Sequence, residues 1–123
     1  MAGDDHEFRS ACSIARTLDI LGDKWTILVV RDLAWHGKHT FLELQSSAED
    51  IPANLLSNRL RRLMAWGLVT RQPYQDRPVR YRYQLTDQGR DLEPVLKSIM
   101  AWGHKHLEGG HFDTEAEPSQ QGA

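Results

Sequence analysis

The sequence has few cysteines, no long apolar run and no secretion signal. Its 123 residues include one cysteine, Cys12, which excludes an internal disulfide framework and favours a reducing compartment. The longest aliphatic run, ILVV at 27–30, is too short to span a bilayer. The N-terminal MAGDDHEF also lacks the basic start and apolar core of a signal peptide. We therefore expect a soluble, cytoplasmic protein with no membrane partner.

The patterns that enzymes use are missing as well. The acidic residues show no paired arrangement for general acid–base chemistry, and there is neither a glycine-rich phosphate loop nor a serine in a nucleophile elbow. Six histidines, including His36 with His39 and His104 with His106, raise the question of a metal. A strong metal site needs a matched set of ligands, and only one cysteine is present. We expect no enzyme, no metal and no cofactor.

The length and composition indicate one globular domain with a tail at each end. Apolar residues make up 40% of the chain and charged residues 26%, which is ordinary for a folded domain. We place the domain at 12–107, after a flexible tail at 1–11 and before an acidic, disordered tail at 108–123. A body of this size buries a modest core, so dimerisation would add useful buried surface.

Positive charge is concentrated in one segment, although the formal net charge is −2. Between residues 59 and 82 the only acid is Asp76, against seven arginines: Arg59, Arg61, Arg62, Arg71, Arg77, Arg80 and Arg82. A basic cluster in a nearly neutral protein is typical of a surface that meets polyphosphate. A solvated helix face explains many such clusters equally well, and charge alone does not separate the two readings.

Apolar residues at helical spacing predict four helices, at 12–21, 24–36, 41–47 and about 52–66. Asp23 is expected to cap the second helix, and Thr40 with Glu43 has the spacing of a capping box for the third. Pro52 suits the first turn of the fourth, because its missing amide hydrogen would have no partner there. Glycines stand where three of these helices should end: Gly22, Gly37 and Gly67.

The periodicity changes to two after the fourth helix. Alternation in VRYRYQL predicts a strand at 79–85, paired with 68–74 through a turn at 75–78 that has Arg77 near its tip. Pro73 favours an exposed edge for this hairpin. Thr86 is expected to cap a long final helix that is kinked or starts late at Pro94. The order predicts an α+β, mostly α, winged helix-turn-helix with a two-stranded wing and a long C-terminal dimerisation helix.

One face of the fourth predicted helix is polar, and its residues are Asn54, Ser57, Asn58 and Arg61. Amide side chains match the edge of adenine and arginine that of guanine, so this face suits the major groove of DNA. Arg59 and Arg62 lie on its flank. Each could contact a backbone phosphate or form an internal ion pair, and the sequence does not choose between these roles. The residues assigned to phosphate and wing contacts are Lys38, Thr40, Arg62, Arg77, Arg80 and Arg82.

The matching segments CSIARTLDILGDKWTILVVRDL, FLEL, LLSNRLRRLMAWGLVTR and YRYQLTDQGRDLEPVLKSIMAWG resemble the HxlR family of bacterial transcription regulators, relatives of the MarR family. The resemblance implies a homodimer on palindromic double-stranded DNA, with the fourth helix in the major groove and the wing on the backbone or minor groove. Some members sense oxidants or electrophiles through a cysteine near the start of the first helix, the position that Cys12 holds here, and the alternative for Cys12 is a small residue packed at the dimer interface. Ser13, where the family commonly has proline, and Pro52, where a capping serine often stands, depart from the pattern.

The final helix carries an apolar stripe wider than one small domain can cover, which predicts a dimer surface shared with the first helix. The residues assigned to it are Ile14, Leu18, Leu92, Leu96, Ile99 and Met100. Three functions remain open: a DNA-binding regulator, a winged-helix module that binds protein instead of DNA, and a sensor of a small molecule or electrophile. The polar face of the fourth helix favours the first.

Overall fold

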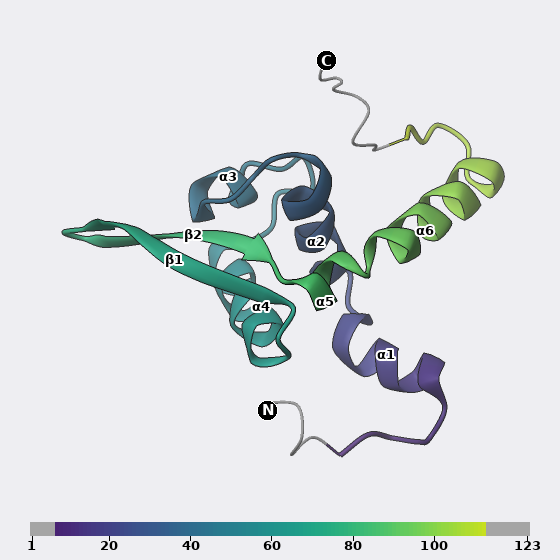
Figure 1. Cartoon of the computed structure of the whole chain (residues 1–123). Helices are drawn as coiled ribbons and strands as arrows, with labels where there is room; N and C mark the ends of the chain where they lie inside the picture. Colours follow the sequence, from purple (N-terminus) through teal and green to yellow (C-terminus); the bar gives the residue numbers. More distant parts are fainter. Residues whose placement is uncertain (1–6, 113–123) are drawn as a thin grey trace.

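The computed structural model describes residues 7–112, so most of both predicted tails, at 1–6 and 113–123, lies outside the described residues. Within residues 7–112, six helices and two strands follow one another: α1 (Ser13–Leu21), α2 (Thr26–Trp35), α3 (Phe41–Gln45), α4 (Ala53–Ala65), β1 (Val69–Asp76), β2 (Val79–Leu85), α5 (Asp87–Arg90) and α6 (Glu93–His106). The strands form an antiparallel hairpin that projects from the helical body, with α1 and α6 at the opposite end (Figure 1). This is the predicted winged helix-turn-helix, with its wing at one end and its longest helix at the other.

The core lies between α2, α4 and the base of the hairpin. The side chains with less than 2% exposure are Leu44, Leu56, Leu60, Leu63, Val30 and Val69. Three of them come from α4 at the helical spacing that the sequence predicts, because residues three and four apart share a face. This buried side fixes the rotation of α4 and so directs its polar face outward.

The start and end of α4 follow local chemistry. Pro52 is the residue before the helix, with extended backbone (φ −60°, ψ 145°), and its carbonyl accepts the first helical bond from Leu56. The expectation that Pro52 lies in the first turn is therefore wrong by one residue, because the fixed φ of proline fits both positions. Gly67 ends the helix at φ +79°, a conformation that residues with a side chain avoid, as expected.

Two other boundaries differ from expectation. The second helix begins at Thr26 rather than at residue 24, because Lys24 and Trp25 form a turn that the Asp23 carboxylate caps through the Trp25 amide and the Thr26 hydroxyl. The wing is longer than expected: Gln75 pairs with Arg80 and Asp76 with Val79. The connection is therefore Arg77–Pro78 alone, and the strand register shifts between Pro73 and Gln75.

The predicted break in the last helical region is confirmed. The Thr86 hydroxyl accepts from the Gly89 amide at 3.0 Å and caps only the short α5, after which α6 begins with Pro94 in its first turn. The capping box of Thr40 and Glu43 is also present, and the helix that it starts ends at Gln45, two residues before the predicted end.

Candidate nucleic-acid interface

The outward face of α4 presents the four predicted polar residues. Asn54, Ser57 and Arg61 are exposed and Asn58 is half-buried, directly opposite the buried leucines. The side-chain oxygen of Asn58 accepts from the Arg59 guanidinium at 2.5 Å, which leaves the Asn58 amide nitrogen as its free group. An exposed row of amide, hydroxyl and guanidinium groups on one helix is chemically suited to base edges.

The two flanking arginines are engaged inside the protein. Arg59 pairs with Asp23 at 2.5 Å, so the ion-pair reading holds for this residue. Burial raises the pKa of the Asp23 carboxyl, but hydrogen bonds from Thr26, Arg59 and the Trp25 amide outweigh it and lower the pKa to about 2. Arg62 is half-buried and donates to the Asp19 carbonyl at 3.4 Å, so its guanidinium is turned toward the end of α1.

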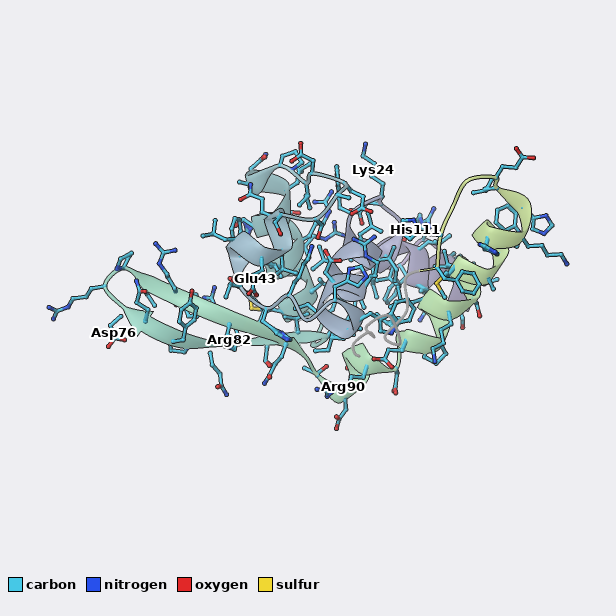
Figure 2. The ribbon with its side chains drawn as sticks, turned by 90° about the horizontal axis from the view of Figure 1, so that it is seen from above. Lys24, Glu43, Asp76, Arg82, Arg90 and His111 are labelled. Atoms are coloured by element: carbon cyan, nitrogen blue, oxygen red, sulfur yellow. The ribbon has the colours of Figure 1, made fainter. Side chains whose placement is uncertain are left out.

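Other arginines of the basic segment have no acidic partner within residues 7–112. They are Arg61 on α4 and, in and around the wing, Arg71, Arg77, Arg80 and Arg82. Arg82 packs its guanidinium 5.6 Å from the centre of the Tyr74 ring. Figure 2 shows Asp76 and Arg82 along the projecting hairpin, far from Arg90 at the α5 end. Positive charge is thus left uncompensated on the α4 face and the wing.

Arg71 belongs to this set and was not assigned by the sequence. It pairs in register with Tyr83, and its guanidinium carbon lies 3.8 Å from the centre of the Tyr81 ring. Together with Ser57, Arg61 and others it lines a recess of about 280 Å³ between α3, α4 and the hairpin. Alternation counted from the buried Val69 would have put Arg71 on the inner face of the wing.

Lys38 and Thr40 make contacts within the protein instead. The Lys38 ammonium donates to the Ser47 hydroxyl at 2.9 Å, and the Thr40 hydroxyl accepts from the Glu43 amide. The amides of His39 and Thr40 lower the pKa of the Glu43 carboxyl. Thr40 also bridges to Arg82 of β2 through its backbone, which adds a short third pairing to the base of the wing that the sequence did not predict.

An ionic cluster of the buried Arg31 and Asp32 with the exposed Glu49 ties α2 to the loop that precedes α4. The Arg31 guanidinium donates to both oxygens of Glu49 at 2.9 and 2.8 Å and to Asp32 at 2.9 Å. These contacts raise the pKa of Arg31, although its burial opposes this, and hydrogen bonds from Arg31 lower the pKa of Glu49 to about 2. Ser47 donates a further hydrogen bond to Asp32. The cluster fixes where the loop delivers the first turn of α4.

Cys12 stands at the beginning of α1, as predicted, and is exposed. Its amide donates to the Ser10 hydroxyl at 3.2 Å. Arg16, one turn on, is directed to the Ser10 carbonyl at 2.8 Å and lies over the Phe8 ring at 4.8 Å. Phe8 in turn contacts Trp66 beyond α4, with ring centres 5.8 Å apart. The segment before α1 therefore connects the cysteine to the end of α4.

The predicted dimer residues divide into three groups by exposure. Ile14, Leu18 and Ile99 are 72%, 52% and 54% exposed, while Leu92 and Met100 are half-buried. Leu96 is buried in the core of the protomer itself. Further large apolar side chains are exposed on and after α6: Val95, Trp102 and Leu107. The end of the molecule that carries α1 and α6 thus exposes large apolar side chains. Figure 1 places this end opposite the wing, where the arginines without an acidic partner lie.

A groove larger than the recess beside Arg71 lies elsewhere in the described chain. It has a volume of about 440 Å³ and lies between α2 and α6, lined by Ile27, Leu28, Trp35, Ile99 and Met100 among others. Within residues 7–112, no three histidine, cysteine or carboxylate side chains gather as a metal site would require. No described helix is long and apolar enough to cross a membrane.

Known proteins similar to this chain include regulators of transcription and a redox regulator. The chain is 39% identical over 102 residues to an uncharacterised HTH-type transcriptional regulator of Mycobacterium tuberculosis, covering 83% of this chain and 63% of that relative's length. The structure of PA1607, a proposed transcription factor, matches with a TM-score of 0.73 and 36% identity over 85% of this chain and 73% of the other. The reduced form of the redox regulator HypR matches with a TM-score of 0.68 and 34% identity, covering 79% of this chain and 95% of HypR.

A family model spans most of the chain. The model for the HxlR-like helix-turn-helix matches residues 20–111, from the end of α1 to beyond α6. The named relatives are transcription regulators rather than enzymes, which agrees with the uncompensated basic face of α4 and the wing. The protein belongs to the HxlR-like helix-turn-helix family of transcription regulators.

Proposed function

We propose that this protein is a homodimeric transcription regulator that binds palindromic double-stranded DNA through α4 and the β1–β2 wing. The observation that carries the proposal is the separation of arginines on α4: Arg59 is neutralised by Asp23, whereas Arg61 is exposed without a carboxylate in the described residues. The unpaired charge of Arg61, beside the amides and the hydroxyl of the same face, gives α4 a positive outward surface that is suited to DNA.

In this proposal α4 lies in the major groove and reads bases through Asn54, Ser57, Asn58 and Arg61. Base contacts give sequence preference, while phosphate contacts position the protein. Arg77, Arg80 and Arg82 on the wing then supply phosphate or minor-groove contacts. Lys38, Thr40 and Arg62 were assigned to phosphate as well, and their internal bonds support a role in holding the wing and α4 in place.

The dimer is proposed to form through the apolar end of the protomer. Ile14, Leu18 and Ile99, joined by Trp102, expose apolar surface of a kind that a small soluble domain usually covers. A twofold dimer presents two copies of α4 to half-sites whose centres are about one helical turn of DNA, or a multiple of it, apart. Light scattering should report a dimer at micromolar protein concentration without DNA, and a monomer would contradict this part of the proposal.

Regulation is proposed to act through Cys12, since the similar protein HypR is a redox regulator and Cys12 is exposed here at the beginning of α1. Modification by an oxidant or electrophile would change DNA affinity only if it favours one relative orientation of the two copies of α4. The groove between α2 and α6 offers a second place for a small effector. Operator affinity before and after diamide, for the native protein and Cys12→Ser, tests the first route: equal affinity in all four measurements would leave Cys12 without a sensing role.

Selection of bound genomic fragments at two salt concentrations tests DNA binding itself. We expect enrichment of a palindromic sequence and weaker binding at the higher salt concentration. A winged-helix module that binds only protein would enrich no sequence at either concentration, and that result would overturn the proposed function.

A further inference from the structure

Two arginines from different elements line one recess where α4 meets the wing. Arg61 comes from α4 and Arg71 from β1, and Ser57 lies on the same wall as Arg61. The other lining residues are apolar or aromatic: Phe41, Leu60, Met64 and Tyr83. The recess therefore contains two positive charges and one hydroxyl, and the rest of its lining is uncharged.

No carboxylate lines the recess, and neither arginine has a carboxylate within 4.0 Å among residues 7–112. Two like charges on the walls of one recess repel each other, and an anion between them replaces that repulsion by attraction to both. The composition of the recess thus favours an anionic occupant over a neutral one.

The way Arg71 is held narrows the kind of anion. Its guanidinium carbon lies 3.8 Å from the centre of the Tyr81 ring, a cation–π contact that holds the group over the ring. A stacked guanidinium keeps the N–H groups along its edge for a ligand, and that fork matches the oxygens of a phosphate. Because Tyr81 already orders the side chain, less conformational entropy is lost when the phosphate binds.

We propose that this recess binds one backbone phosphate of double-stranded DNA, with Arg71 as its ligand, while Arg61 on the opposite wall contacts the adjacent base edge. The proposal rests on the proposed function, since it assumes that α4 lies in the major groove. It adds a contact at the junction of α4 and β1 to those on the rest of the wing. A phosphate held there sets how far along the groove Arg61 and Ser57 are placed.

The first test compares Arg71→Gln with the native protein on operator and on an unrelated duplex over a series of salt concentrations. Glutamine keeps a planar polar group beside Tyr81 and removes the charge. We expect a loss of roughly five- to tenfold on both duplexes and a salt slope smaller by about 0.9, the value for one phosphate. Arg71→Lys, which keeps the charge, should keep the native slope. Arg90→Gln is the matched control, because Arg90 is an exposed arginine of α5 away from the wing, and it should bind as the native protein does.

The second test replaces single operator phosphates by neutral methylphosphonates. At one operator position, the methylphosphonate should weaken binding by the native protein and by Arg71→Lys but leave binding by Arg71→Gln unchanged. Binding by Arg61→Ala should still be weakened at that position. Equal affinity and slope for native protein and Arg71→Gln, or a methylphosphonate pattern that Arg71→Gln does not change, would overturn the inference and leave the proposed function standing. A native protein that selects no DNA sequence would overturn both.

Discussion

Arg59 and Arg61 are two residues apart on the same helix and have opposite environments. Arg59 is held by Asp23 at 2.5 Å inside the domain, and Arg61 is exposed with no carboxylate partner among the described residues. The same division separates the buried Arg31 cluster from the arginines of the wing. The comparison teaches that the basic segment contains two kinds of arginine. One kind is paired with a carboxylate inside the domain, and the other is exposed and is the kind that we propose contacts DNA.

Breaking the internal ion pairs, which are those of Arg59 with Asp23 and of Arg31 with Asp32 and Glu49, should have the largest effect. Arg31→Ala leaves Asp32, whose side chain is 4% exposed, without its main counter-charge. We expect the free energy of unfolding to fall by about 3 kcal/mol, as it does when one partner of a buried ion pair is removed. Urea unfolding followed by circular dichroism measures this. Arg90→Ala should change the same quantity by less than about 0.5 kcal/mol, and equal stability of the two variants would show that the Arg31 cluster contributes little.

Removing Arg61 should weaken DNA binding and leave the stability of the fold almost unchanged. Arg61→Ala should cost about 1–3 kcal/mol on the selected operator and relax its sequence preference, because a bidentate arginine contact to guanine is lost. Its unfolding free energy should stay within about 0.5 kcal/mol of the native value, since the side chain is exposed. Fluorescence anisotropy on operator and on single-base variants measures the first effect. Unchanged selectivity would mean that this face of α4 does not read bases.

Acid should weaken the internal ion pairs, because their carboxylates become protonated. The folded-state pKa of Asp23 and Glu49 is about 2, below the ordinary values of 3.8 and 4.5. Their stabilisation is complete above about pH 4.5 and is lost as the pH falls toward 2, because the unfolded chain takes up protons first. Asp23→Asn removes one such group. We therefore expect the variant to lose about 1 kcal/mol less unfolding free energy than the native protein between pH 5 and pH 2. Unfolding curves between pH 5 and 2 that run parallel for both proteins would contradict the assignment.

Single wing arginines should have the smallest effect. Arg80→Ala and Arg82→Ala should each weaken operator and unrelated DNA alike, by less than about 1 kcal/mol, and reduce the salt slope by about 0.9. Binding titrations at several salt concentrations check this. A loss confined to the operator would instead place these residues on base edges.

The sequence predicted the face of α4 well because a helix with three buried leucines can rotate in only one way. It left Arg59 open between phosphate and an ion pair, assigned Arg62 to phosphate although its guanidinium donates to the Asp19 carbonyl, and did not assign Arg71. The partner of Arg59 lies 36 residues away, at Asp23, and such a separation has no local signal. For Arg71 a local signal existed. Residues two apart in a strand face the same side, so Arg71 shares the inner face of β1 with Val69, which pairs with Leu85 of β2.

Boundaries were less predictable than elements. Pro52 fits the position before a helix and the first turn equally, and the wing lengthened because Gln75 and Asp76 pair across it. The Arg31 cluster was missed altogether, since Arg31 and Asp32 sit within an apolar run and their partner Glu49 lies in a polar connection. Only the folded arrangement of α2 against that loop brings the three together.

The apolar end and the basic end of the protomer respond to salt in opposite directions. Contact between apolar surfaces such as those of Ile14 and Ile99 is strengthened by salts that are excluded from protein surfaces, whereas contact with phosphates is weakened by every salt. In a dimer joined at the apolar end, sulfate should therefore hold the two copies together while it releases the DNA. Protein concentration and ionic strength would then act as separate controls, the first on assembly and the second on occupancy of the operator.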